Sequence, residues 1–171
     1  MAKALLVIDM LNDFLDKDGA LSIGDSKSII ENVSSRIKEN RLNRNTIIYI
    51  MDRHLPQDAE FKMFPIHCLE GDKGAEIIEE LAPEKGDYQI SKRRYSAFFG
   101  TDLDLTLREL GVTELELCGV CTQICVLYTA ADARMLNYDV TVLKDCVDSF
   151  DKTAHKFALA EMQKTLGIKV I

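Results

Sequence analysis

The stretch TELELCGVCTQICVLYTAADARMLN, residues 113–137, contains a strand pattern followed at once by a helix pattern. Residues 113–120 alternate apolar and polar positions and then become continuously apolar, which is typical of a buried strand. Residues 122–137 are apolar on nearly every face, which predicts a buried helix. A buried strand that leads directly into a buried helix is the unit from which parallel α/β sheets are built.

The same alternation of strand and helix patterns extends over the rest of the chain. Further buried strands are predicted at residues 3–9, 45–52, 87–91, 139–145 and 168–171, and further helices at residues 26–42, 102–111 and 153–167. This order predicts an α/β protein with a mainly parallel sheet. Because the chain has 171 residues and no low-complexity linker, we expect a single domain over residues 1–171.

The composition argues against several classes of protein. The net charge is -7, with acidic residues scattered along the chain, so binding to nucleic acid or to an anionic membrane is not expected. Neither a signal peptide nor a run of eighteen apolar residues is present, so we expect a cytoplasmic protein. In that reducing compartment the five cysteines should be free thiols or ligands rather than disulfides.

Three cysteines within residues 118–125 allow three interpretations. Cys118 and Cys121 have the spacing of a redox pair, but Cys118 belongs to the strand pattern and should be buried. A structural zinc site would need a second pair of this spacing, which the sequence lacks. The third interpretation is a nucleophile. With Thr122 as helix N-cap, Cys125 lies in the first turn, where backbone amides and the helix dipole favour a thiolate.

Two charged residues at other strand ends strengthen the nucleophile hypothesis. Asp9 and Lys92 each follow a predicted strand, as Asp145 does, and the carboxyl ends of parallel strands share one edge of a sheet. Taken singly, Asp9 could cap a strand, Lys92 could be a solvated charge, and Cys125 could be a small core residue. Taken together, they have the composition of a nucleophile with its base and its electrostatic partner.

The long connection after the second predicted strand has the composition of a metal site. It begins with the D-x-H pair of Asp52 and His54, whose side chains can point the same way, and it also contains His67. Either Asp58 or Glu60 could supply a second carboxylate. Mixed carboxylate and imidazole donors suit Zn²⁺, Fe²⁺ or Mn²⁺, although the two histidines could equally be ordinary polar loop residues.

These motifs, in this order and over essentially the whole chain, resemble those of nicotinamidases within the isochorismatase-like cysteine hydrolases. The matching segments are LLVIDMLNDF (5–14), MDRH (51–54), EFKMFPIHCLEGDKGAE (60–76), SKRRYSAFFGTDL (91–103) and CGVCTQICV (118–126). The resemblance implies a three-layer, Rossmann-like α/β fold with a six-stranded, mainly parallel sheet.

The resemblance also implies roles for the residues at the strand ends. Asp9 matches the general base, Lys92 the catalytic lysine and Cys125 the nucleophile. The backbone amides of Cys121 and Cys125 match an oxyanion hole, with a cis peptide bond before Cys121. Cys121 itself stands where the family commonly has alanine, and Gln123 stands where an acidic residue is common, so the pocket is expected to differ in shape.

One divalent metal ion is implied as a cofactor, with Zn²⁺ favoured and Fe²⁺ or Mn²⁺ as alternatives. The implied metal ligands are Asp52, His54, Glu60 and His67. Glu60 matches better than Asp58 because of its spacing to His67. The residues implied to contact a flat substrate ring are Phe14, Phe64 and Tyr95, of which the two phenylalanines could sandwich the ring.

The activity implied is metal-dependent hydrolysis of nicotinamide to nicotinate and ammonia, a reaction of pyridine nucleotide salvage. Isochorismatase-type members of this group generally lack the metal histidines, so DRH and PIH favour an amidase. The alternatives are a cysteine amidase acting on a carbamoyl or ureido group, a metal-binding protein without turnover, and a thiol-redox protein using Cys118 and Cys121. The expected partner is a small amide, and a homo-oligomer is compatible with the sequence.

Overall fold

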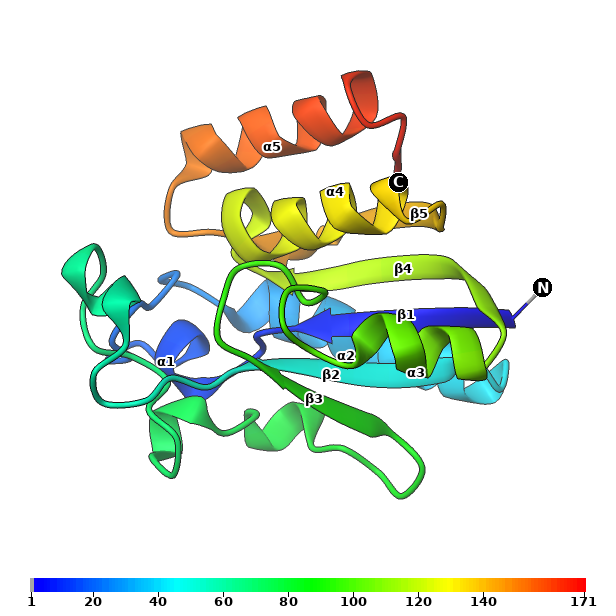
Figure 1. Ribbon diagram of the computed structural model, residues 1–171. Coiled ribbons are helices and arrows are strands. Elements are labelled where there is room, and N and C mark those ends of the chain that lie inside the picture. The colour runs from blue at the N-terminus through cyan, green and yellow to red at the C-terminus, as the bar shows by residue number, and fades with distance from the viewer. Residues whose placement is uncertain (1) are drawn as a thin grey trace.

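The computed structural model describes residues 2–171 and contains a six-stranded sheet between two layers of helices (Figure 1). The strands are β1 (Ala2–Ile8), β2 (Thr46–Asp52), β3 (Tyr88–Lys92), β4 (Val112–Val120), β5 (Asp139–Asp148) and β6 (Lys169–Val170). Their order across the sheet is β3-β2-β1-β4-β5-β6, and each pairing between neighbouring strands of this sheet is parallel. This is the strand order of a Rossmann-like sheet, and the predicted fold class is confirmed.

Helices cover both faces of the sheet. Two lie on one face, α1 (Asn12–Leu15) and α2 (Lys27–Leu42), and three lie on the other, α3 (Leu103–Glu109), α4 (Leu127–Met135) and α5 (Lys152–Lys164). A π-helix over Thr122–Val126 precedes α4, and three short 3₁₀ helices cover Ala59–Lys62, Lys73–Ala75 and Glu79–Leu81. All three 3₁₀ helices belong to the one connection between β2 and β3, which begins at the carboxyl side of the sheet, toward which the β1 arrow points in Figure 1, and returns to the amino side to start β3.

The alternation of side chains along β1 explains the three layers. Leu5 and Val7 belong to the apolar core beneath α1 and α2, whereas Leu6 and Ile8 belong to the core beneath α3, α4 and α5. Successive side chains of a strand point to opposite faces of its sheet, so a continuous apolar strand supplies both cores at once. The near-continuous apolar character of the predicted strands therefore has its physical cause in burial on two sides.

Two predicted boundaries are corrected by the structure. The fifth strand continues to Asp148, so Asp145 lies within β5 and is exposed rather than placed at a strand end. An irregularity in the pairing of β4 with β5 near Leu117 and Gly119 lets β5 continue beyond the expected stop. The single helix expected over residues 122–137 is divided into the π-helix and α4. In addition, the short helix α1 was not predicted from the sequence patterns.

The described residues 2–171 contain no helix that is both long and apolar enough to cross a membrane. All five cysteines are free and buried. Cys118 lies in the core and donates a long hydrogen bond to the Leu6 carbonyl, so its expected role in packing is consistent with its position.

A buried polar cluster ties α2 to the middle of the sheet. Glu116 on β4 accepts hydrogen bonds from Arg36 at 2.7 and 3.0 Å and from Asn40 at 3.2 Å, and Lys3 on β1 lies 3.2 Å away. Its side chain is only 6% exposed. Burial works to raise the pKa of Glu116, but the hydrogen bonds from Arg36 and Asn40 outweigh it and hold the pKa below its ordinary value.

We expect Glu116→Gln to lower the free energy of unfolding by about 2 kcal/mol near pH 7, because buried donors lose a charged acceptor. Because the pKa of Glu116 is lower in the folded state, its carboxylate stabilises the fold at pH values above the ordinary glutamate pKa. This contribution is lost as the pH falls through the folded-state pKa. Urea unfolding of both proteins at about pH 7 and about pH 3 measures the effect. An equal difference at the two pH values would show that the charge of Glu116 does not matter.

Candidate active site

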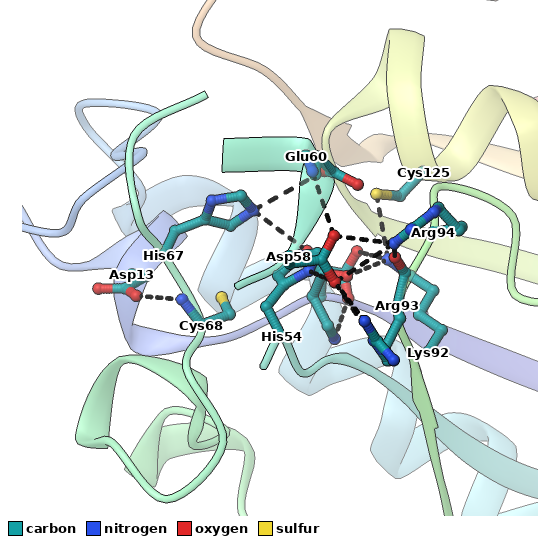
Figure 2. Close-up of polar contacts among 12 residues, drawn as sticks. Asp13, His54, Asp58, Glu60, His67, Cys68, Lys92, Arg93, Arg94 and Cys125 are labelled. Atoms are coloured by element: carbon teal, nitrogen blue, oxygen red, sulfur yellow. Dashed lines mark hydrogen bonds and ion pairs between the residues drawn. The ribbon is translucent and has the colours of Figure 1, made fainter. Parts of the chain in front are cut away.

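Three side chains from different strand ends meet at the carboxyl edge of the sheet. Lys92, the last residue of β3, places its Nζ atom 2.9 Å from Asp9 Oδ2 and donates a hydrogen bond of 3.3 Å to Cys125 Sγ (Figure 2). The same Nζ donates to Asp52 Oδ1 at 3.0 Å. All four side chains are buried. The predicted grouping of Asp9, Lys92 and Cys125 is therefore present in the fold.

The local backbone explains how Asp9 comes to face this group. The residue directly follows β1 and has a φ of 52°, a left-handed conformation that turns the chain out of the sheet. Its amide donates to the Ile50 carbonyl at 2.9 Å, and its Oδ1 accepts from the Asp52 amide at 2.8 Å. With Oδ1 anchored in this way, Oδ2 is directed at Lys92.

Burial and charge set the protonation states. Burial raises the pKa of Cys125 well above its usual range, and the neighbouring Asp9 carboxylate adds to this effect. Burial likewise raises the pKa of Asp9, although Lys92 opposes it. Burial also disfavours a charged Lys92, but the Asp52 and Asp9 carboxylates outweigh it and raise the lysine pKa well above its ordinary value. The resting group is a neutral thiol beside a protonated lysine and a carboxylate of increased basicity.

The segment that carries Cys125 differs from the expected helix start. Cys121, not Thr122, is the N-cap residue, and its carbonyl accepts hydrogen bonds from the amides of Ile124 and Val126. The predicted capping role of Thr122 is therefore wrong. In the wide turn of a π-helix its hydroxyl points away from the first-turn amides and lies 2.8 Å from His155 Nδ1 on α5.

The backbone before this helix is unusual in two ways. The peptide bond between Val120 and Cys121 is cis, as the family resemblance implied. Gly119 has a φ of 115°, and a Cβ atom there would lie 1.9 Å from the Ile8 carbonyl oxygen. Only glycine fits, because β4 approaches β1 closely at this point. This close approach brings Cys121 and Cys125 over the end of β1, next to Asp9.

Beside this group, four buried residues form a cluster of metal-binding type. Asp52 Oδ2 lies 2.9 Å from His54 Nε2 and 3.4 Å from His67 Nε2, and Glu60 Oε1 lies 4.0 Å from His67 Nε2. One ligand atom from each residue falls within 4.8 Å of the other three. Ligands about 2.1 Å from a tetrahedral zinc ion are roughly 3.4 Å apart, so these positions fit a single divalent ion.

Both histidines of the cluster have an oxygen atom close to the other ring nitrogen, although only that of His67 meets hydrogen-bond geometry. His67 Nδ1 lies 2.8 Å from the Pro65 carbonyl oxygen, and His54 Nδ1 lies 3.1 Å from Asp58 Oδ2. Such contacts direct Nε2 toward the metal position. Of the two carboxylates that the sequence left open, Glu60 belongs to the cluster, whereas Asp58 lies behind His54.

A small cavity opens onto both groups. The predicted substrate residues Phe14, Phe64 and Tyr95 all line it, and so do Cys121 and Cys125. The metal-type cluster contributes its other walls through Asp52, Glu60 and His67. Phe14 and Phe64 both present their rings to His67, at centroid distances of 5.9 and 6.3 Å. The cavity therefore joins the thiol, the candidate ligands and apolar aromatic walls.

A family model described as an isochorismatase domain matches residues 3–171 of the chain. The chain belongs to the isochorismatase family of hydrolases. A nicotinamidase/pyrazinamidase, PncA, from Bacillus subtilis has a crystal structure that superposes with a TM-score of 0.94 at 36% identity, over 99% of each chain.

Two further solved structures are similar to this chain. The pyrazinamidase of Pyrococcus horikoshii, solved in complex with zinc, superposes with a TM-score of 0.94 at 33% identity, over 100% of this chain and 99% of that chain. The N-carbamoylsarcosine amidase of Thermoplasma acidophilum superposes with a TM-score of 0.89 at 33% identity, over 99% of this chain and 95% of that chain.

Some residues at the site were not predicted from the sequence. Leu21, Ile124 and Phe150 also line the cavity, and Asp58 contacts a candidate metal ligand. Phe150 lies two residues beyond the end of β5 at Asp148, so the rule that sites lie beyond strand ends would have found it if the boundary had been predicted correctly. The predicted boundary placed Asp145 at this strand end instead.

Proposed function

We propose that this protein is a metal-dependent cysteine amidohydrolase that converts nicotinamide to nicotinate and ammonia. The observation that carries the proposal is one cavity lined both by the Cys125 thiol, which is backed by a carboxylate and a lysine, and by Asp52, Glu60 and His67 of the metal-type cluster. Aromatic side chains complete the walls, as a flat heteroaromatic amide requires. The similarity to a nicotinamidase/pyrazinamidase supports the same substrate class.

The first half of the reaction forms a thioester. Asp9, whose pKa is raised by burial, takes the thiol proton of Cys125 as the sulfur attacks the carboxamide carbon. Lys92 stabilises the developing thiolate from 3.3 Å and stays protonated between its two carboxylates. The backbone amides of Cys121 and Cys125 hold the oxyanion. Asp9 then returns its proton to the leaving nitrogen, and the C–N bond breaks to release ammonia.

The second half of the reaction hydrolyses the thioester. Asp9, now ionised, takes a proton from a water molecule as its oxygen attacks the thioester carbon. The same backbone amides hold the second oxyanion, and the C–S bond breaks to release nicotinate. The proton on Asp9 passes to the departing sulfur, which restores the neutral Cys125 thiol.

The donor set of Asp52, His54, Glu60 and His67 fits one divalent ion, with Zn²⁺ favoured and Fe²⁺ or Mn²⁺ as alternatives. The zinc complex of the Pyrococcus horikoshii relative supports this choice. When bound, the ion supplies an electrophilic contact for the pyridine nitrogen. The protein's own contribution is to place that contact and the Cys125 sulfur on the walls of one cavity, so that the carboxamide is presented to the thiol.

The charge of the cavity favours a neutral substrate over one that carries a carboxylate. Within residues 2–171, the side chains that line the cavity include the carboxylates of Asp52 and Glu60 but neither arginine nor lysine. An N-carbamoyl amino acid would place its own carboxylate there without a basic side chain as partner. Nicotinamide has no such group.

The proposal predicts that metal-loaded protein releases ammonia from nicotinamide, with kcat/KM at least about tenfold higher than for an N-carbamoyl amino acid. Treatment with a chelator should remove most of this activity, and Zn²⁺ should restore it, because the ring loses the contact that orients it. Ammonia release measured for both substrates, before and after chelation, checks both parts.

The possible outcomes separate the parts of the proposal. Hydrolysis of the N-carbamoyl substrate alone would show that the substrate class is wrong while the amidase chemistry holds. Unchanged nicotinamide turnover in chelated, metal-free protein would show that the metal has no role in the reaction. No ammonia from either substrate would contradict the amidase assignment itself.

A further inference from the structure

The two arginines of the SKRRY segment have no role in the reaction described above, yet both point at one buried group. Arg93 and Arg94 follow Lys92 directly at the end of β3, and their side chains are 51% and 41% exposed. Figure 2 shows both guanidinium groups turned toward Asp58, whose side chain is 0% exposed. A fully buried carboxylate with two partly exposed arginines over it is an arrangement that stabilises the ionised form.

The contacts on this side of Asp58 are numerous. Arg93 Nη2 and Nε donate to Oδ2 at 3.0 and 3.2 Å, and Arg94 Nη1 donates to Oδ1 at 3.0 Å. Asp58 is therefore held by two arginines that directly follow Lys92 at the end of β3.

On its other side, Asp58 contacts two of the four candidate metal ligands. Its Oδ2 lies 3.1 Å from His54 Nδ1, the ring nitrogen that faces away from the cluster, and a small rotation of the ring would turn this close contact into a hydrogen bond. Its Oδ1 accepts a hydrogen bond of 3.1 Å from the Glu60 amide, which makes Asp58 the N-cap of the 3₁₀ helix that carries Glu60. One carboxylate therefore fixes the ring of one ligand and the backbone of another.

We propose that Asp58 is a positioning residue of the metal centre, held in place by Arg93 and Arg94, which sets the orientation of His54 and the location of Glu60. The proposal rests on the metal site of the proposed function, but not on nicotinamide as the substrate. A histidine whose Nδ1–H donates to a carboxylate keeps its Nε2 lone pair for a metal ion and is a stronger ligand. The arginine pair offsets the free-energy cost of burying the Asp58 carboxylate. It also links the connection between β2 and β3, which carries the candidate metal ligands, to the end of β3.

Asp58→Asn is the sharpest variant for a test. Asparagine has the same shape and remains a good N-cap for the helix that carries Glu60, but its neutral side chain is a much weaker acceptor for His54. We expect the dissociation constant for Zn²⁺, measured by competition with a chromophoric chelator, to rise about 10- to 100-fold. In the zinc-loaded wild type, ¹⁵N NMR should show the proton of His54 on Nδ1.

Asp87→Asn is the matched control. Asp87 also pairs with an arginine, Arg41, and also accepts a backbone amide, that of Glu84, with its side chain only 8% exposed. It touches no candidate ligand. The zinc affinity of Asp87→Asn should equal that of the wild type, so a change confined to Asp58→Asn reflects the metal centre rather than the general loss of a buried carboxylate.

A second variant keeps the test valid if Asp58→Asn does not fold. The double change Arg93→Gln and Arg94→Gln leaves Asp58 in place, removes its support, and should weaken zinc binding about threefold to tenfold, so wild-type zinc affinity in this variant would also overturn the proposal. Wild-type affinity in folded Asp58→Asn, or a metal ion on Nδ1 of His54, would overturn the proposal. A wild type that binds zinc but does not hydrolyse nicotinamide would contradict the proposed function and leave the role of Asp58 to be decided by the affinities.

Discussion

Replacing Cys125 with alanine is expected to lower kcat/KM for amide hydrolysis by at least about 10⁴-fold, because the proposed thioester forms on its sulfur, which is the thiol that contacts Lys92. The sulfur lies 3.3 Å from Lys92 Nζ, and its pKa reflects both burial and the nearby Asp9 carboxylate. Removing it enlarges the cavity slightly but leaves the four candidate metal ligands in place. The variant should therefore bind Zn²⁺ with wild-type affinity while releasing no measurable ammonia from nicotinamide.

Cys118→Ala is the matched control for this substitution. Cys118 is a fully buried cysteine of the same segment, but it faces the sheet core and contacts the Leu6 carbonyl. We expect its replacement to cost some stability and to leave ammonia release within about threefold of wild type. The reverse pattern, with Cys118→Ala inactive and Cys125→Ala active, would favour the redox interpretation and reject Cys125 as the nucleophile.

Replacing Lys92 with methionine is expected to have the largest effect on stability. The lysine side chain is buried and is the cation shared by Asp9 and Asp52, at 2.9 and 3.0 Å. Methionine fills similar space but leaves two buried carboxylates facing each other, which should lower the free energy of unfolding by about 3–5 kcal/mol near pH 7. The loss should shrink as the pH falls, because protonation of one carboxylate removes the repulsion.

Urea unfolding of chelator-treated wild type and Lys92→Met measures this effect without a contribution from metal binding. Lys3→Met provides the comparison, because Lys3 also pairs with a buried carboxylate but is 33% exposed, and its loss should cost less than about 1 kcal/mol. Equal costs for the two substitutions would show that Lys92 is an ordinary structural charge. Ammonia release by Lys92→Met should also be strongly reduced, since the thiolate loses its counter-charge.

Much of the fold and the reactive group can be read from local sequence patterns. The central strands are predictable because burial on both faces makes them short, nearly continuous apolar runs, whereas the edge strands β3 and β6 are largely exposed and are recognised by their place in the alternation of strands and helices. Once the sheet is parallel, Asp9 and Lys92 share an edge with the start of the helix after β4, because every strand points the same way. The family resemblance added the cis peptide before Cys121 and the choice of Glu60 as a candidate ligand, neither of which follows from periodicity.

Features that depend on how distant segments pack were decided only by the tertiary structure. The hydroxyl of Thr122 has helix N-capping chemistry in any sequence, yet the wide turn and the position of α5 direct it to His155. Asp58 and Glu60 are equivalent candidates by composition. The path of the loop places Glu60 at the cluster and Asp58 between His54 and the arginine pair. Hydrophobic periodicity is a property of residues close together in the sequence. The sequence by itself therefore determines the strands and helices, and the edge of the sheet at which the strand ends meet. The partners of a buried charge come from the whole chain, so only the folded structure shows that Asp58 lies between His54 and the arginine pair.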